Sequence, residues 1–277
     1  RRRSPALGSY ALVPARGTVL SNPNGKISSS FFSGDPDYYT ETQTIGSIGY
    51  RFEHRFGDAV SFTQNVRYSH VEGKEKDLQP AGLEADLRTL DRYAFYNSNR
   101  NDTVLVDNQL HAELDTGPVS QAFTVGLDYQ RIAVHNLYGF NFVDIPAIDI
   151  FSPDYHVSIP SMPAEDLGTT DTVLSQIGVY GQDQFKLGNW RLLLGAREDW
   201  SKEHFVFTAP VGENRMTQDQ SEHAFTWRAG LVYLFDNGLA PYFSYSTSFQ
   251  PQAQTTFEGA PFVPTTAQQY EIGLKYQ

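Results

Sequence analysis

The sequence predicts an all-β fold, an antiparallel β-barrel that crosses a membrane with its strands. Apolar and polar residues alternate over several segments, which indicates strands with one apolar face. Most of these segments reach the roughly 9–11 residues that a tilted spanning strand needs, whereas globular strands usually have about 5–6. Short and long connections alternate along the chain, as in outer-membrane barrels, where short turns are periplasmic and long loops extracellular.

Composition excludes a helical membrane protein. The chain has 277 residues, of which 40% are hydrophobic, and its mean hydropathy is −0.42. A spanning helix needs about 20 consecutive apolar residues, and the sequence contains no such run. Aromatic residues make up 14% of the chain, which fits both β-strands and the aromatic girdles of a barrel.

The first two predicted strands are 47–56 and 60–70, joined by a turn at Gly57-Asp58. The other strands are expected within the ranges 104–114, 123–129, 175–187, 190–200, 225–235, 242–249 and 268–276. Tight turns are expected at 56–59, 116–120, 187–189 and 236–238, and long loops at 71–103, 135–172, 204–222 and 250–267. Residues 1–44 are rich in proline, glycine and serine and predict one more extracellular loop, entering a strand near Thr44.

Charged residues occupy the face opposite the apolar one and are expected to line the interior of the barrel. They are Arg51, Glu53, Arg67, Asp107, Glu113, Asp128, Arg197, Asp199, Arg228, Glu271 and Lys275. The alternative is a soluble antiparallel sheet with one solvated face. Since a closed barrel leaves no strand edge in lipid, about nine strands predict a partial barrel.

Other kinds of chemistry are not indicated. The net charge is −11 and no basic stripe is present, so no nucleic-acid partner is expected. The chain has no cysteine, its seven histidines lack metal-ligand spacing, and no G-x-S-x-G elbow appears, so no directly bound cofactor and no enzymatic activity are expected. The Arg1-Arg2-Arg3 run predicts an exposed loop, with a contact to lipopolysaccharide as the alternative.

Several strings, in order along the chain, resemble TonB-dependent siderophore receptors of the ferrichrome or hydroxamate branch. They are Val179-Tyr180-Gly181-Gln182-Asp183-Gln184, Leu194-Gly195-Ala196-Arg197-Glu198-Asp199-Trp200, Phe225-Thr226-Trp227-Arg228, Tyr233-Leu234-Phe235-Asp236-Asn237-Gly238 and Gln269-Tyr270-Glu271-Ile272-Gly273-Leu274-Lys275-Tyr276. The strings Gly17-Thr18-Val19-Leu20 and Phe52-Glu53-His54 are similar to that branch as well.

The resemblance implies a monomeric barrel of about 22 strands that spans the bacterial outer membrane and contains an N-terminal plug. It implies uptake of an Fe(III)–siderophore driven by the TonB complex, with the iron already chelated by its carrier. Residues 1–277 would form part of this barrel, with the plug, the TonB box and the C-terminal strands outside the chain. Outer-membrane lipid and lipopolysaccharide would surround it.

The resemblance also suggests ligand-binding residues on the extracellular side. Tyr10 and Leu12 correspond to an aromatic-Gly-aromatic-Leu-Pro string of that branch, where Leu12 replaces the second aromatic residue. Phe151 and Tyr155 lie in a string similar to the family's aromatic-Asn-Pro loop. Rigid aromatic side chains suit a bulky ferric chelate. For each of them the alternative is loop packing or anchoring at the membrane interface.

Two other functions stay open. A receptor of the same family could carry heme or cobalamin. A soluble all-β carbohydrate-binding or hydrolase domain would instead have short strands and helices.

Overall fold

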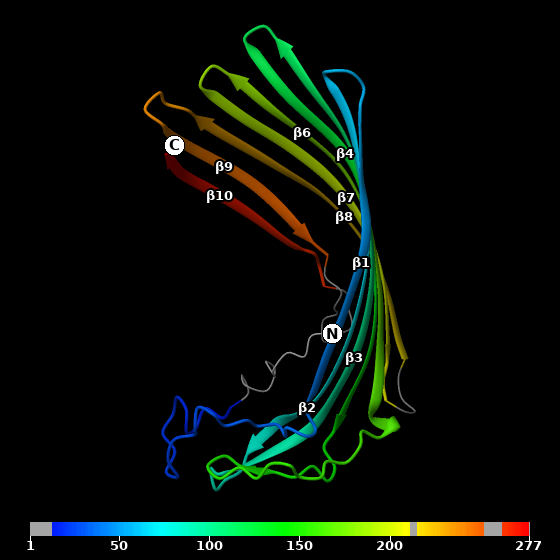
Figure 1. Cartoon of the computed structure of the whole chain (residues 1–277), viewed down its shortest axis with the longest axis vertical. Coiled ribbons are helices and arrows are strands. Elements are labelled where there is room, and N and C mark those ends of the chain that lie inside the picture. Colours follow the sequence, from blue (N-terminus) through cyan, green and yellow to red (C-terminus); the bar gives the residue numbers. More distant parts are fainter. Residues whose placement is uncertain (1–12, 211–214, 252–261, 277) are drawn as a thin grey trace.

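The structure, a computed structural model, describes residues 13–210, 215–251 and 262–276, which fold into one curved antiparallel sheet (Figure 1). The strands pair in the order β1-β2-β3-β4-β6-β7-β8-β9-β10, so neighbours in the sequence are neighbours in the sheet. The short strand β5 pairs with the end of β3. The elements are β1 (Thr40–Arg55), β2 (Val60–Leu83), β3 (Thr89–Thr116), β4 (Val119–Asn141), β5 (Ile148–Asp149), the 3-10 helix η2 (Ala164–Asp166), β6 (Leu167–Leu187), β7 (Trp190–Thr208), β8 (Arg215–Tyr233), β9 (Leu239–Gln250) and β10 (Thr265–Tyr276).

The nine long strands that the alternation predicts are confirmed, but most are longer than expected. They have 12 to 28 residues. The predicted long loops at 71–103 and 204–222 are wrong, because β2 and β3 are joined by residues 84–88 alone and β7 continues to Thr208. Beyond the apolar belt a strand no longer has one side that faces lipid. In β2 the alternation of apolar and polar residues therefore ends at about residue 70, while its backbone hydrogen bonds to β1 and β3 continue.

The tight turns lie together at one end of the sheet, as predicted (Figure 1). The connections between β3 and β4 and between β6 and β7 have two residues each. In both, a glycine adopts positive φ, 65° at Gly117 and 52° at Gly188. Two-residue hairpin turns require this left-handed conformation, which glycine adopts without a steric penalty.

The two faces of the sheet differ in chemistry. Tyr50, Val66, Val106 and Tyr129 share one register row across four strands and belong to the apolar face. Large apolar side chains on this face are exposed, for example Ile272 at 85%. No helix or second sheet covers it within the described ranges. This continuous apolar belt is what a lipid-facing barrel wall requires.

The buried core lies among the connections at the extracellular end, and the sheet itself has little of it. Ile27, Phe31, Leu90, Ile148 and Ile150 form one cluster that joins segment 13–39 to the far end of β3 and to segment 142–166. Figure 1 shows both segments beside each other at the end opposite the tight turns. In the described part of the chain, no helix has the length and apolarity needed to cross a membrane.

Candidate functional site

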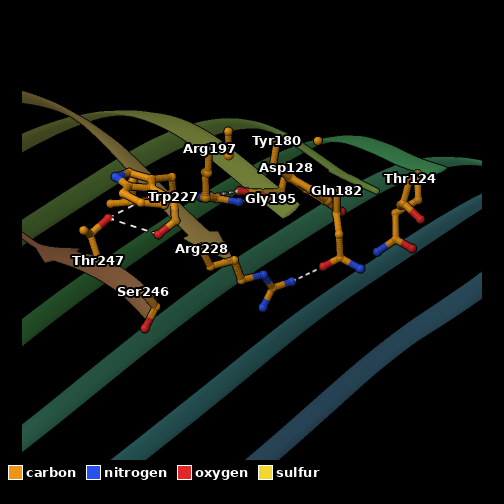
Figure 2. Close-up of a pocket in the computed structure, with 14 residues that line it drawn as sticks. Thr124, Asp128, Tyr180, Gln182, Gly195, Arg197, Trp227, Arg228, Ser246 and Thr247 are labelled. Carbon is orange, nitrogen blue, oxygen red and sulfur yellow. Dashed lines mark hydrogen bonds and ion pairs between the residues drawn. The ribbon is translucent and has the colours of Figure 1, made fainter. Parts of the chain in front are cut away.

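A network of charged side chains crosses the polar face of the sheet (Figure 2). The guanidinium of Arg197, on β7, donates to Asp128 on β4 and to Asp199 on its own strand. One Arg197 nitrogen lies 2.9 Å from Asp128 and 2.6 Å from Asp199. Gln176 donates a further hydrogen bond of 2.7 Å to Asp199, which is only 4% exposed. The cation thus joins two carboxylates across three strands, so neither is left unpaired.

Tyr180 extends this network toward β3. Its hydroxyl donates a 2.7 Å hydrogen bond to Asp107, and the Arg197 guanidinium lies 5.6 Å from the centre of its ring. The ring lies over Gly126, where an added Cβ would come within 2.2 Å of it. A Cβ added at Gly178 would likewise come within 2.0 Å of the Arg197 guanidinium. Two glycines therefore provide the space in which the long side chains lie flat against the wall.

These side chains border a hollow of about 690 Å³ on the polar face. Arg228, on β8, reaches over it and donates to Gln182 on β6, as Figure 2 shows. Hydroxyl, amide and guanidinium groups on this wall can bind a polar surface inside a barrel.

A wall of six aromatic rings lies on the same polar face, nearer the extracellular end. The residues are Tyr93, Phe95, Tyr138, Phe140, Phe142 and Phe207. The rings of Tyr93 and Phe142 stack with centroids 4.9 Å apart, and Phe95 lies 5.4 Å from Phe140. Phe140 is 42% and Phe142 65% exposed, although both belong to this packed cluster. Exposed rings held rigidly by neighbouring rings offer contact area at low entropy cost.

The strand register explains why the aromatic rings meet. Side chains alternate between the faces with a period of two. Tyr93 and Phe95 therefore share the face of Asp107 on β3, and Phe140 shares the face of Asp128 on β4. Tyr96, on the other parity of β3, points to the apolar face. All six positions fall in ranges for which the sequence predicts long loops, so the wall was not predicted. If the strands had been predicted at their full length, the period of two would have placed these side chains on the polar face.

Phe151 and Tyr155, two predicted ligand residues, lie in the extracellular core. Tyr155 stacks on Phe32 with ring centroids 6.5 Å apart, and its hydroxyl donates to the Phe32 carbonyl and accepts from the Phe32 amide. Phe151 packs against the buried cluster, beneath the Arg88 guanidinium at 5.9 Å. Tyr10 and Leu12 lie outside the described residues. Phe151 and Tyr155 thus belong to the unit in which segments 13–39 and 142–166 pack together, which we call the loop module. They lie apart from the six-ring wall.

Ionic contacts also hold the loop module together. His156 Nδ1 lies 2.9 Å from Asp37 Oδ2, and the hydrogen bond to Asp37 raises the pKa of His156. The Asp86 carboxylate accepts from the hydroxyl and amide of Thr89, which lowers the pKa of Asp86. No cluster of three or more His, Asp or Glu side chains with metal-binding geometry occurs among the residues that the structure describes.

Comparisons with known proteins agree with this architecture. The family model "TonB dependent receptor-like, beta-barrel" matches residues 2–277. A ferrioxamine B receptor of Salmonella typhimurium is 33% identical over 99% of the chain and 38% of its own length. The ferrichrome outer membrane transporter/phage receptor of Escherichia coli is 29% identical over 99% of the chain and 39% of its own length. The chain thus spans about two fifths of the curated relatives it matches.

The fold also matches solved structures. The closed form of the ferric-catecholate import receptor Fiu from Escherichia coli superposes with a TM-score of 0.79 at 21% identity. The superposition covers 92% of the chain and 41% of that receptor. At this identity the likeness concerns the fold alone.

Proposed function

Because the chain belongs to the family of TonB-dependent receptor β-barrels, we propose that the whole protein takes up an Fe(III)–siderophore across the bacterial outer membrane. The chain is an outer-membrane β-barrel wall with its apolar face toward lipid. Two of its relatives are named as receptors for ferrioxamine B and for ferrichrome, which favours a carrier of the hydroxamate type. The family is one of receptors, and we assign the chain no catalytic role.

The observation that carries the proposal is the six-ring wall on the polar face. A ferric siderophore is bulky and largely shielded from its metal charge, so it is bound through packing surface and a few polar contacts. Phe140 and Phe142 supply exposed rings, and the Tyr93 hydroxyl, which donates to Gln79 at 2.7 Å, adds a polar group beside them. The charged network around Arg197 lies on the same face but nearer the tight turns, where it would contact the plug domain inside the barrel.

Several partners follow from this function and are proposed with it. The TonB complex would supply the energy, and a plug domain and further strands from the rest of the protein would complete the barrel. The receptor would work as a monomer surrounded by lipid and lipopolysaccharide. The long strands, of up to 28 residues, are incompatible with the alternative of a soluble carbohydrate-binding domain with short strands.

Growth on defined iron sources tests the proposal. The full-length gene, expressed in a strain lacking its own hydroxamate receptors, is expected to restore growth and ⁵⁵Fe uptake with ferrioxamine B or ferrichrome. Uptake should require an intact TonB system. Rescue by heme but by neither siderophore, or cobalamin-dependent growth of a cobalamin auxotroph expressing the gene, would instead favour the alternative cargo.

A further inference from the structure

Several side chains on the polar face, between the Arg197 network and the six-ring wall, carry acceptor atoms that no donor reaches. Glu203, on β7, is only 8% exposed and has no ion pair or hydrogen-bond partner for its carboxylate among the described residues. Buried side-chain oxygens of Asn97, Asn136, Gln218 and Gln220 accept no hydrogen bond there either. The register places all five residues, which we call the acceptor band, on the polar face. Because buried polar atoms in folded proteins nearly always have partners, we expect a ligand or another part of the protein to supply them.

Glu203 and Gln220 lie directly opposite each other on β7 and β8. Opposite residues of an antiparallel pair have Cβ atoms about 4.5–5.5 Å apart, so both side chains border the same small volume. The Gln220 amide nitrogen donates to the Glu222 carboxylate at 2.9 Å and to the Phe262 carbonyl at 3.0 Å. Both of its N–H groups are therefore used, and only its oxygen remains available beside Glu203. Two acceptors thus face the same space, and no donor lies between them.

The surrounding wall offers no cation to this space. Between Arg197 and the extracellular end, the inward positions described in β3, β4, β6, β7 and β8 hold no lysine, arginine or histidine. Glu222 instead adds a second carboxylate, two residues from Gln220 on β8. Asn97 is opposite Tyr138 of the six-ring wall, so the acceptor band is continuous with the surface that we propose for the cargo. The missing partner is therefore a cation with several N–H donors, and a primary ammonium group has three donors and no acceptor.

We propose that Glu203 and Gln220 bind a protonated primary amine of the ferric siderophore, so that the receptor prefers a cationic chelate to a neutral one. The ammonium group would donate to the Glu203 carboxylate and to the Gln220 amide oxygen. Glu203 lies about 13 Å below Phe207 along β7, because a strand rises about 3.3 Å per residue. A chelate packed on the six-ring wall would therefore reach Glu203 through a flexible arm that ends in the amine. This inference rests on the proposed function and adds the charge of the cargo, which the aromatic rings do not specify.

The test compares two ferric chelates that differ in this charge alone. Ferrioxamine B carries a free terminal amine, and acetylation of that amine leaves the iron centre unchanged but makes the chelate neutral. The affinity of the purified full-length receptor for each chelate is measured by intrinsic fluorescence quenching. We expect the cationic chelate to bind about tenfold more tightly or better, since charge-assisted hydrogen bonds distinguish it from the neutral one. Glu203→Gln should weaken binding of ferrioxamine B to the level of the acetylated chelate, whose own affinity should not change.

Two control variants make the result specific to Glu203. Glu113→Gln removes a carboxylate from the same face at the tight-turn end of β3 and should keep the full preference. Glu203→Asp retains the charge and should keep part of it. Heat-modifiable migration on gels checks that each variant is folded.

The possible outcomes separate this inference from the proposed function. Equal affinity of the unmodified receptor for both chelates would overturn the preference while leaving a siderophore receptor. Equal loss for both chelates in Glu203→Gln would also overturn it, because Glu203 would then act through packing or through a contact with the plug. Loss of the preference in Glu113→Gln would show that it does not depend on the acceptor band. Failure to bind ferrioxamine B, its acetylated form and ferrichrome alike would contradict the proposed function itself.

Discussion

The Tyr180 hydroxyl donates a 2.7 Å hydrogen bond to Asp107, across the intervening strand β4. The bond is possible only because position 126 on β4 is a glycine, over which the phenol ring lies. Three strands are thereby fixed to one another by side chains as well as by the backbone ladder. The wall that faces the barrel interior is therefore rigid where the polar network crosses it.

This relation predicts the effect of filling the space under Tyr180. Gly126→Ala would place a methyl group 2.2 Å from the ring, which must then move and lose Asp107. We expect a loss of about 1–3 kcal/mol in the free energy of unfolding, as for other overpacked sites. Gly181→Ala is the matched control, because nothing lies within 4 Å of an added Cβ there. Thermal unfolding of the full-length receptor in detergent should separate the two variants, and equal melting temperatures would refute the packing argument.

Arg197 provides a second prediction for the same network. Replacing it with glutamine leaves Asp128 and the nearly buried Asp199 close together without their cation. Because Arg197 and Asp128 are 30% and 24% exposed, solvent screening reduces the cost to about 1–3 kcal/mol. Asp128→Asn in the Arg197→Gln background should restore part of the stability. Additive losses in the double variant would show that the two side chains are not coupled.

The sequence was sufficient for the sheet but not for its site, and particular residues show why. Tyr50 and Val66 could be assigned to the lipid face because their neighbours alternate in polarity. Asp128, Arg197 and Asp199 could be assigned to the polar face for the same reason, and this prediction is confirmed. Which of them touch depends on the register between strands. Local alternation does not determine this register.

The aromatic wall could not be predicted from the sequence for a further reason. Tyr93 and Phe140 lie in strand extensions beyond the membrane belt, where both faces are polar or mixed and the period of two is lost. Their contact also spans 47 positions in the sequence, so it requires the pairing of β3 with β4. Phe151 and Tyr155 were selected from the resemblance alone, and whether they bind ligand stays a prediction.

The contact between His156 and Asp37 predicts a pH dependence in the loop module. The Asp37 hydrogen bond raises the pKa of His156, with smaller contributions from Asp35 and Asp154. Its stabilising effect is therefore complete below the ordinary histidine pKa of about 6.5 and is lost as the pH rises through the raised value. His156→Gln lacks this effect at every pH.

Hydrogen exchange at Val157, whose amide donates to Asp35 at 3.2 Å, reports on this contact. The ratio of exchange rates, His156→Gln over the unmodified receptor, cancels the intrinsic pH dependence of exchange. We expect a ratio well above one at pH 5.5 that approaches one at pH 8.5. A ratio independent of pH would show that the contact does not hold the two segments together.

The aromatic wall predicts which rings contribute to ligand affinity. Phe140→Ala and Phe142→Ala remove exposed rings of the cluster, and each should weaken binding of the ferric siderophore about tenfold, since a well-packed ring contact is worth on the order of 1–2 kcal/mol. Tyr96→Ala removes a ring of the same strand region from the opposite, outward face of the sheet and should leave affinity unchanged. Intrinsic fluorescence quenching on the full-length receptor measures all three.

Tyr155→Phe removes only the hydroxyl that contacts Phe32, so it should loosen the loop module and change affinity little if Tyr155 packs the loops. A loss as large as that of Phe142→Ala would instead place the ligand against the loop module and away from the wall.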